Sequence, residues 1–220
     1  MIDNYKECSN IHVFYGEYNL GLAFALNYLI DIALKHGYDY IARMDSDDVS
    51  YSSRLERQVE FMTSNPHLDV SGTSCREFGS NFALSNKTLP SNHEELKDFS
   101  VARCPFIHPT VIFKTEVFIS GIRYPTNTSF TEDMALWFEL LKLGCRFGNL
   151  QEILLDYRLN ENTLAKRAGL AKATSEMALR FKYMFIFRRF SFKNTLLILF
   201  RLPFHLLPES FAKFIYKNMR

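Results

Sequence analysis

The order of apolar patterns along residues 10–163 is the feature that most restricts the fold of this chain. Short apolar or β-branched runs predict strands, and they alternate with stretches of helical spacing, where apolar residues recur every three or four positions. Such alternation is typical of an α/β fold in which helices cover a mostly parallel sheet. The expected strands are residues 10–15, 40–44, 68–71, 110–113 and 153–157.

The helix boundaries are marked by local end signals. Apolar residues at helical spacing over residues 22–33 predict the first helix, and Gly37 is placed to end it. In the second helix we expect Leu55, Val59 and Met62 to form the buried face. Capping boxes are predicted at Ser53 with Glu56, Ser91 with Glu94, and Ser129 with Glu132.

Composition excludes several classes of protein. Hydrophobic residues make up 47% of the 220 residues, with only 9 Gly and 7 Pro, so the chain is neither disordered nor collagen-like. Its four cysteines form no CxxC pair, which argues against a zinc cluster or a disulfide scaffold and fits a reducing compartment. Residues 1–9 carry charges and lack the apolar core of a signal peptide.

Charge is distributed unevenly along the chain. Residues 180–220 contain nine Lys or Arg and one acid, a charge of +8, so the rest of the chain, with a total of +2, carries −6. The same stretch holds 11 of the 33 aromatic residues. Small residues cluster near 165–175, and we expect an acidic globular body at residues 1–170 and a basic aromatic tail at residues 171–220.

The basic aromatic tail has two possible roles, membrane binding and packing on the body. It lacks the roughly 20 uninterrupted apolar residues that a spanning helix needs. Basic, aromatic and amphipathic segments commonly lie at the headgroup level of a membrane, so the tail is expected to bind a membrane surface. The alternative is a helical hairpin that packs on the body. A nucleic-acid partner is not expected, because the tail is too apolar and no recognition module precedes it.

The sequence Asp45-Ser46-Asp47-Asp48 follows the expected strand 40–44 directly. Ligands of open α/β sheets bind just beyond the carboxyl ends of strands. Carboxylate oxygens suit Mg²⁺ or Mn²⁺, which commonly bridge to substrate phosphates. The cluster therefore indicates a metal site, and the alternative is a solvated acidic loop before the next helix.

Three further positions are candidates for chemistry, and each also has a structural reading. Glu132 and Asp133 lie at an expected helix start, where they are either a cap or a general base. His108, before Pro109, is more often a packed residue than a ligand. Arg158, after an apolar strand, could hold phosphate or form a surface ion pair.

Six short motifs lie along residues 10–163. They are Asn19-Leu20-Gly21 with Asn27, Arg43-Met44-Asp45-Ser46-Asp47-Asp48, Arg54-Leu55-Glu56-Arg57-Gln58, Phe106-Ile107-His108-Pro109-Thr110, Thr131-Glu132-Asp133-Met134-Ala135-Leu136-Trp137 and Leu154-Leu155-Asp156-Tyr157-Arg158. In this order they resemble the family 2 glycosyltransferases, and among these the bacterial enzymes that build capsule, exopolysaccharide or lipopolysaccharide glycans.

The resemblance implies a GT-A fold, the nucleotide-diphospho-sugar transferase fold, and inverting transfer of a sugar from a nucleotide-diphosphate donor. Carried over by motif position, Asp45 contacts the nucleotide ribose and Asp47 binds Mn²⁺ or Mg²⁺ beside the diphosphate. Asp48 supports that loop, and Arg158 is the further donor-binding candidate.

On the acceptor side, the resemblance makes Asp133 the base that deprotonates the acceptor hydroxyl, with Glu132 beside it. Trp137 belongs to the same side, where we expect it to pack behind the site rather than touch sugar. The implied acceptor is a glycan or a lipid-linked glycan. The implied location is cytoplasmic, peripheral on the inner face of the plasma membrane.

Two departures from the family pattern bear on activity. Neither the family's apolar-Pro-x-Tyr-Asn segment nor its Asp-Asp-Gly-Ser segment is found, so the domain is expected to be N-terminally incomplete. Asn160 stands where many relatives have His, a better metal ligand. The alternative function is therefore a catalytically inactive, membrane-docked remnant or partner-binding protein.

Overall fold

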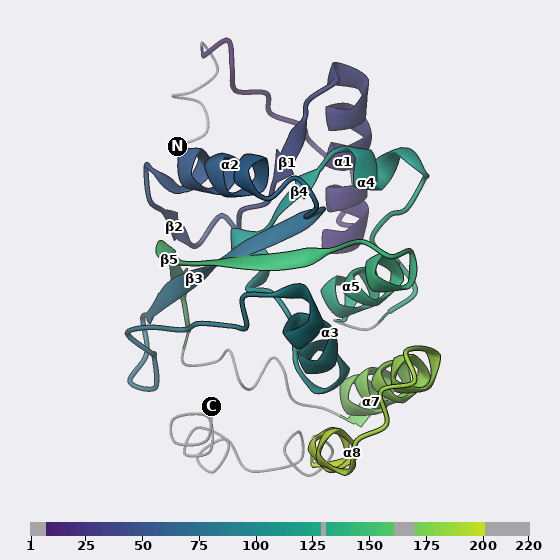
Figure 1. The fold of residues 1–220 in the computed structure, drawn as a ribbon. Coiled ribbons are helices and arrows are strands. Elements are labelled where there is room, and N and C mark those ends of the chain that lie inside the picture. Colours follow the sequence, from purple (N-terminus) through teal and green to yellow (C-terminus); the bar gives the residue numbers. More distant parts are fainter. Residues whose placement is uncertain (1–7, 129–130, 161–169, 201–220) are drawn as a thin grey trace.

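The computed structural model describes residues 8–128, 131–160 and 170–200, in which helices cover a mixed sheet (Figure 1). The strands hydrogen-bond in the order β1-β4-β3-β5-β2. Their bounds are β1 Tyr40–Ala42, β2 Val49–Ser50, β3 Val70–Phe78, β4 Ile112–Lys114 and β5 Phe147–Arg158. The helices are α1 Leu22–His36, α2 Arg54–Ser64, α3 His93–Ala102, the 3₁₀ turn η2 His108–Thr110, α4 Glu116–Ile119, α5 Glu132–Lys142, α7 Leu170–Ile186 and α8 Phe192–Leu199.

The α/β class is confirmed, but the expectation of a mostly parallel sheet is wrong. Among the described strands only β3 and β5 pair in parallel, and the other three pairings are antiparallel. After β3 the chain passes through α3 and η2. At the end of η2, Thr110 Oγ1 accepts a hydrogen bond of 3.0 Å from the Thr73 N–H of β3. The chain then runs back towards the beginning of β3, where Phe113 lies opposite Val70. This return path makes β4 antiparallel.

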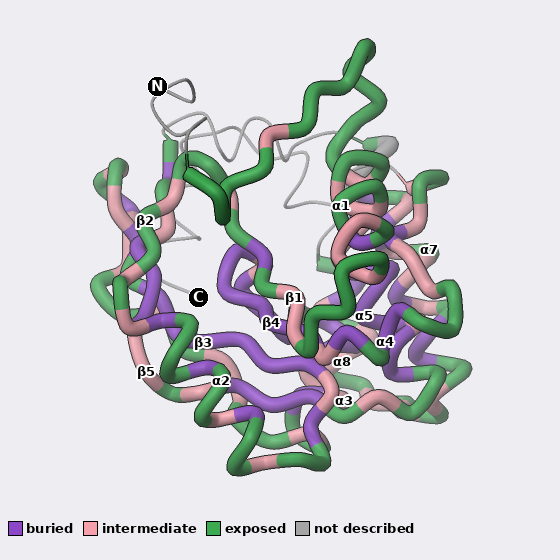
Figure 2. Tube along the Cα trace, turned by 90° about the horizontal axis from the view of Figure 1, so that it is seen from above, coloured by how far each residue is buried: buried purple, intermediate pink, exposed green. Residues whose placement is uncertain are grey.

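Several strand boundaries differ from the sequence prediction. Residues 10–15 form no strand, and the expected strand 110–113 begins only at Ile112, because Thr110 belongs to η2. Strand 40–44 shortens to β1, which is partly exposed rather than buried. Since β1 is the first strand in the sheet order, it has a described neighbour on one side only. In Figure 2 buried stretches of β3 and β4 lie near the centre, whereas β5 alternates buried and partly exposed stretches.

The predicted helices form, but the capping boxes do not. Ser53 precedes α2 without a side-chain cap. Asn92, rather than Ser91, caps α3 by accepting a hydrogen bond from the Glu95 N–H at 3.0 Å. Thr131 is the N-cap residue of α5, and the predicted Ser129 lies outside the described residues. The Gly37 end of α1 is confirmed, with φ of 69° in the left-handed region.

The expected buried face of α2 is wrong in two of three positions. Leu55 and Val59 are exposed, and only Met62 is buried. The buried face consists of Arg54, Gln58 and Met62, spaced four residues apart. Two polar side chains therefore point into the protein, where they bind backbone carbonyl groups.

The tail packs on the body in its described part. Figure 1 places α7 beside α3 and α5, and α8 beside α3. The Tyr183 ring of α7 stacks on Phe138 of α5 with centroids 4.3 Å apart, and Tyr183 belongs to the main hydrophobic core. This is the packing expected of the hairpin alternative. Among the described helices, none is long and apolar enough to cross a membrane.

Candidate functional site

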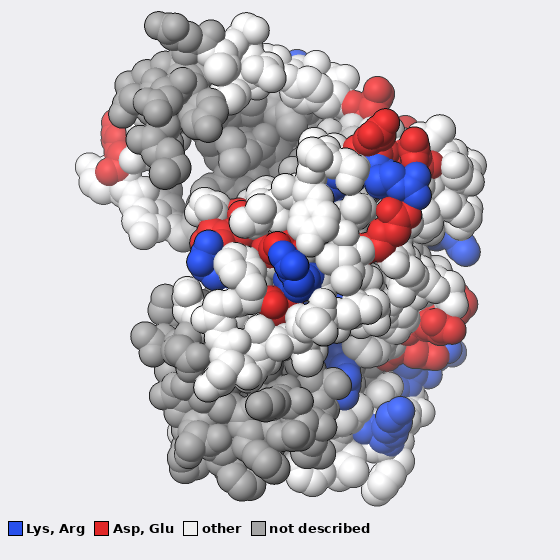
Figure 3. Space-filling model, turned by 90° about the vertical axis from the view of Figure 1, so that its left-hand side faces the viewer, with Lys and Arg blue, Asp and Glu red and all other residues white. Residues whose placement is uncertain are grey.

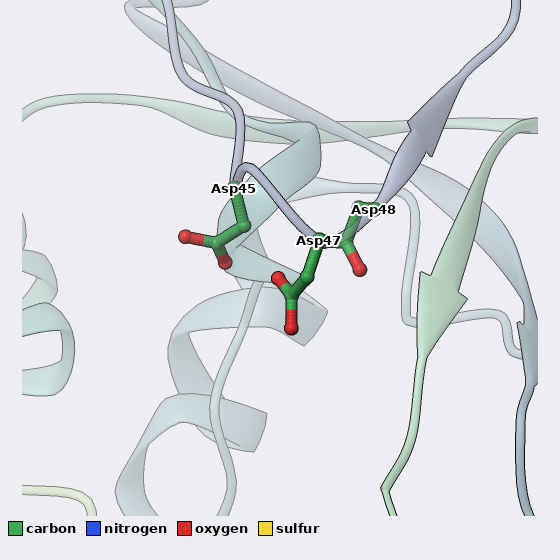
Figure 4. Close-up of side chains that lie close together, drawn as sticks. All are labelled: Asp45, Asp47 and Asp48. Carbon is green, nitrogen blue, oxygen red and sulfur yellow. The ribbon is translucent and has the colours of Figure 1, made fainter. Parts of the chain in front are cut away.

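The acidic loop after β1 brings three carboxylates together. One oxygen from each of Asp45, Asp47 and Asp48 lies within 4.8 Å of the others (Figure 4). Asp47 is exposed and the other two are half-buried. Like charges this close repel unless a cation or solvent lies between them, so the loop can attract a positive ion. On the face shown in Figure 3, acidic and basic side chains are intermixed.

Arg43 holds the first of these carboxylates. Its guanidinium is buried and forms a two-pronged ion pair with Asp45. The Arg43 N–H donates to the Val111 carbonyl at 2.8 Å, which anchors the start of the loop to the chain entering β4. Residues two apart on an extended chain point to the same side, which brings Arg43 to Asp45. Sequence reasoning missed Arg43, although this spacing was available.

Asp48 and Arg158 join the loop to the end of β5. Asp48 Oδ1 accepts a hydrogen bond from the Arg158 N–H at 2.7 Å, and Arg158 Nε donates to the Asp47 carbonyl at 2.8 Å. The Arg158 guanidinium also lies 4.5 Å from the centre of the Phe78 ring. The structure thus brings the predicted donor-binding residues into one place.

The chemistry of this loop fits a divalent metal ion. Burial, together with the charges of Asp45 and Asp47, raises the pKa of Asp48 to about 6. Asp48 Oδ2 is buried and has no hydrogen-bond partner in the described part of the structure. An unpaired buried carboxylate oxygen beside two other carboxylates is a donor set that suits Mg²⁺ or Mn²⁺.

The second acidic pair lies at the start of α5. Glu132 and Asp133 are half-buried, and Asp133 Oδ1 accepts a hydrogen bond from the Met134 N–H at 2.7 Å. The Cys104 thiol lies 3.8 Å from Asp133 Oδ2 and can donate to it. Burial and the neighbouring Asp133 charge raise the pKa of Cys104 to about 12. Cys104 therefore stays a neutral thiol beside the carboxylate.

Tyr124 connects the two acidic groups electrostatically. Its pKa is raised by burial and by the charges of Asp133, Asp45 and Glu132, while Arg43 lowers it. Charges from the acidic loop and from α5 thus both reach one buried hydroxyl group, so the two acidic groups lie in the same region of the protein. No motif in the sequence pointed to Tyr124.

His108 pairs with Tyr124 rather than facing a ligand. His108 Nε2 lies 2.9 Å from the Tyr124 hydroxyl, and its ring packs edge-on against Trp137. Desolvation lowers the pKa of His108 well below its ordinary value, so the ring is neutral at pH 7. This environment fits the interpretation of His108 as a packed residue rather than a ligand.

Trp137 lies behind the site. Its side chain is fully buried and contacts the Phe106, His108, Phe113 and Phe147 rings. This burial fits the expectation that Trp137 packs behind the site rather than touching sugar. Its aromatic contacts hold α5, and with it Asp133, against the sheet.

Comparisons with known proteins agree on one family. The family described as glycosyl transferase family 2 matches residues 1–126. A UDP-Gal:alpha-D-GlcNAc-diphosphoundecaprenol beta-1,3-galactosyltransferase of Escherichia coli is 33% identical over 222 residues, covering 100% of this chain and 78% of that protein. The amylovoran biosynthesis glycosyltransferase AmsE of Erwinia amylovora is 30% identical over 205 residues, covering 93% and 75% respectively.

Solved structures match in fold. The Staphylococcus aureus TarS fragment in complex with UDP-GlcNAc has a TM-score of 0.58 at 16% identity, covering 81% of this chain and 51% of that one. The mannosyltransferase PcManGT of Pyrobaculum calidifontis in complex with GDP-Man and Mn²⁺ has a TM-score of 0.50 at 17% identity, covering 93% and 54%. The chain thus spans about half the length of these solved chains, with which it shares the GT-A fold.

Proposed function

The chain belongs to glycosyl transferase family 2, and from that premise we propose that it transfers a sugar from a nucleotide-diphosphate donor to an acceptor hydroxyl during synthesis of a bacterial surface polysaccharide. The observation that carries the proposal is the carboxylate cluster of Asp45, Asp47 and Asp48 at the end of a strand. The relatives with printed activities are transferases, which gives no support to a non-catalytic remnant.

The acidic loop is the proposed donor site. Asp47, the most exposed of the three carboxylates, is the proposed ligand of Mn²⁺ or Mg²⁺. Asp45 is the proposed ribose contact, held in place by Arg43. Asp48 supports the loop through Arg158, whose guanidinium lies beside the loop as a candidate diphosphate contact. When bound, the metal ion would stabilise the negative charge of the departing diphosphate.

Asp133 is the proposed general base. Its carboxylate is half-buried at the start of α5, next to Glu132 on the proposed acceptor side. Asp133 would take the proton of the acceptor hydroxyl as the acceptor oxygen bonds to the anomeric carbon and the bond from that carbon to the diphosphate breaks on the opposite face, which inverts the anomeric carbon. The proposed acceptor is a glycan or a lipid-linked glycan, the class named for the Escherichia coli relative.

Titration calorimetry of UDP and GDP into the chain, with and without Mn²⁺, tests the donor site. We expect binding that depends on Mn²⁺ and that weakens in Asp47→Asn. Absence of nucleotide binding by a folded sample, judged by circular dichroism, would contradict the proposal.

The base assignment has its own test. Asp133→Asn should keep Mn²⁺-dependent nucleotide binding and lose transfer, measured as release of nucleoside diphosphate from the donor sugar that supports turnover. Transfer by Asp133→Asn at the wild-type rate would exclude Asp133 as the base. Gln is the matched replacement at Glu132, and we expect Glu132→Gln to change acceptor KM more than turnover.

The proposed partner of the tail is the anionic inner face of the plasma membrane. Phe185, Phe190 and Phe192 are 62%, 60% and 85% exposed around the α7–α8 turn. Lys182 and Lys193 are also exposed, and Glu176, the one acid in residues 170–200, is buried. Exposed aromatic side chains beside exposed Lys side chains suit an anionic headgroup layer.

Co-sedimentation of the chain with vesicles tests this partner. Binding should be stronger with phosphatidylglycerol than with phosphatidylcholine vesicles, and should fall in the double variant Phe190→Ser, Phe192→Ser. Tyr18→Ser, at an exposed aromatic residue before α1, is the matched control. Equal binding to both vesicle types would remove the electrostatic part of the proposal.

A further inference from the structure

The motif Arg54-Leu55-Glu56-Arg57-Gln58 has no part in the proposed donor and acceptor contacts, yet its two buried side chains are polar. Arg54 is 3% exposed and Gln58 is fully buried. Burying such groups is costly unless they form hydrogen bonds, so their position on the inner face of α2 requires a compensating contact.

The compensating contacts are backbone carbonyl groups of two separate segments. Arg54 donates to the Pro109 carbonyl at 2.6 Å and to the Arg43 carbonyl at 3.0 Å. Gln58, one helical turn later, donates to the Thr110 carbonyl at 2.8 Å. One face of α2 thus holds the start of the acidic loop and the η2 turn together.

Both of these segments carry the proposed chemistry. Arg43, which supplies one of these carbonyl groups, also forms an ion pair with Asp45 through its guanidinium. The η2 turn contains His108, which pairs with Tyr124, a residue whose pKa is raised by charges of both acidic groups. A shift of either segment would move Asp45 relative to the rest of the site.

We propose that Arg54 is a positioning residue, which sets the acidic loop against the η2 turn and thereby fixes the donor-binding geometry. That the loop binds a nucleotide donor rests on the proposed function. The role of Arg54 in holding the acidic loop against the η2 turn does not. A guanidinium is required because its planar fork reaches two carbonyl groups at once, whereas the single ammonium group of Lys cannot reproduce that geometry.

The experiment compares Arg54→Met, Arg54→Lys and the wild type, with Arg57→Met as the control. Arg57 lies on the same helix, but it is exposed and pairs with Glu60 and Glu152 at the surface. Hydrogen exchange is measured on the ligand-free chain, and calorimetry measures the Kd of UDP with Mn²⁺.

In Arg54→Met we expect faster exchange confined to residues 43–48 and 107–111, and a UDP Kd in the presence of Mn²⁺ raised about tenfold or more. Arg54→Lys should fall between Arg54→Met and the wild type, and Arg57→Met should match the wild type. If Arg54→Met does not fold, the Arg54→Lys result decides.

Two results would overturn the inference. One is unchanged exchange over residues 43–48 and 107–111 in folded Arg54 variants. The other is a uniform rise that includes β3 and β5, which would assign Arg54 a general role in stability. Failure of the wild type to bind UDP would count against the proposed function alone, because the exchange comparison still decides the role of Arg54.

Discussion

Arg180 of α7 offers the sharpest test of how the tail is attached. Its guanidinium is 1% exposed, donates to Glu176 at 2.7 Å, and also donates to the Ser100 and Val101 carbonyls at 3.1 and 3.2 Å. These two carbonyls belong to the last turn of α3, where a positive charge is favoured by the helix dipole. Arg180 is therefore one of the side chains that join the tail to the body, and the contacts of its guanidinium are buried.

Replacing Arg180 with Met should cost about 3–5 kcal/mol of unfolding free energy, since one partner of a buried ion pair is removed. For a chain of this size, that loss corresponds to a fall in Tm of about 6–20 °C. Urea unfolding followed by circular dichroism measures the free energy. The double variant Arg180→Met, Glu176→Met should recover part of the loss, because no buried charge then loses its guanidinium partner.

Arg189→Met is the matched control on the same tail. Arg189 is 36% exposed in its side chain and pairs with Glu94 and Asp98 on the surface of α3. Exposed pairs of this kind contribute about 0–1 kcal/mol. If Arg180→Met changes the unfolding free energy by less than about 1 kcal/mol, within the surface-pair range, then the buried contacts do not hold α7 to α3 and the reasoning fails.

Three further predictions concern the site and the core. Mn²⁺ affinity should fall about tenfold from pH 7 to pH 5, because Asp48, whose pKa is raised to about 6, takes up a proton over this range and the negative charge beside the proposed ligand Asp47 is lost. Calorimetry of Asp48→Asn should give a weaker but flat profile, and a flat wild-type profile would contradict this. Gly72→Ala should lower the free energy of unfolding by about 1–3 kcal/mol in urea, because the added Cβ would lie 2.6 Å from Asn149 Oδ1 and 2.9 Å from Phe106 Cδ1. An unchanged urea midpoint would contradict this tight packing. Cys104, with a pKa of about 12, should react with iodoacetamide at pH 8 about 10³-fold more slowly than a thiol of ordinary pKa, as followed by peptide mass spectrometry. A rate like that of a free thiol would show that the pKa of Cys104 is not raised.

The acidic loop illustrates what sequence patterns can predict. Its position after β1 and the clustering of Asp45, Asp47 and Asp48 follow from four consecutive residues, so local information was sufficient. The helices α1, α2, α3 and α5 were equally predictable from apolar spacing and local end signals, whereas α4 and η2 were not predicted. Metal binding by this cluster and the donor-binding roles of its residues stay predictions.

Arg54 and Tyr124 illustrate what those patterns could not predict. The face of α2 was assigned to Leu55 and Val59 because apolar residues are normally buried, yet two backbone carbonyls from residues 43 and 109 favour Arg54 in that position. Tyr124 is placed by contacts with Asn27, 97 residues away, whose amide group bonds its backbone twice. Neither partner is visible from local spacing.

The sequence by itself determined the α/β class, the helices and the carboxylate cluster, because propensity, periodicity and adjacency act over a few residues. The tertiary structure decided the antiparallel return of β4, the polar buried face of α2, and the packing of α7 on α3 and α5. These outcomes depend on which distant groups satisfy buried hydrogen bonds and charges, and that pairing is settled only when the whole chain packs together.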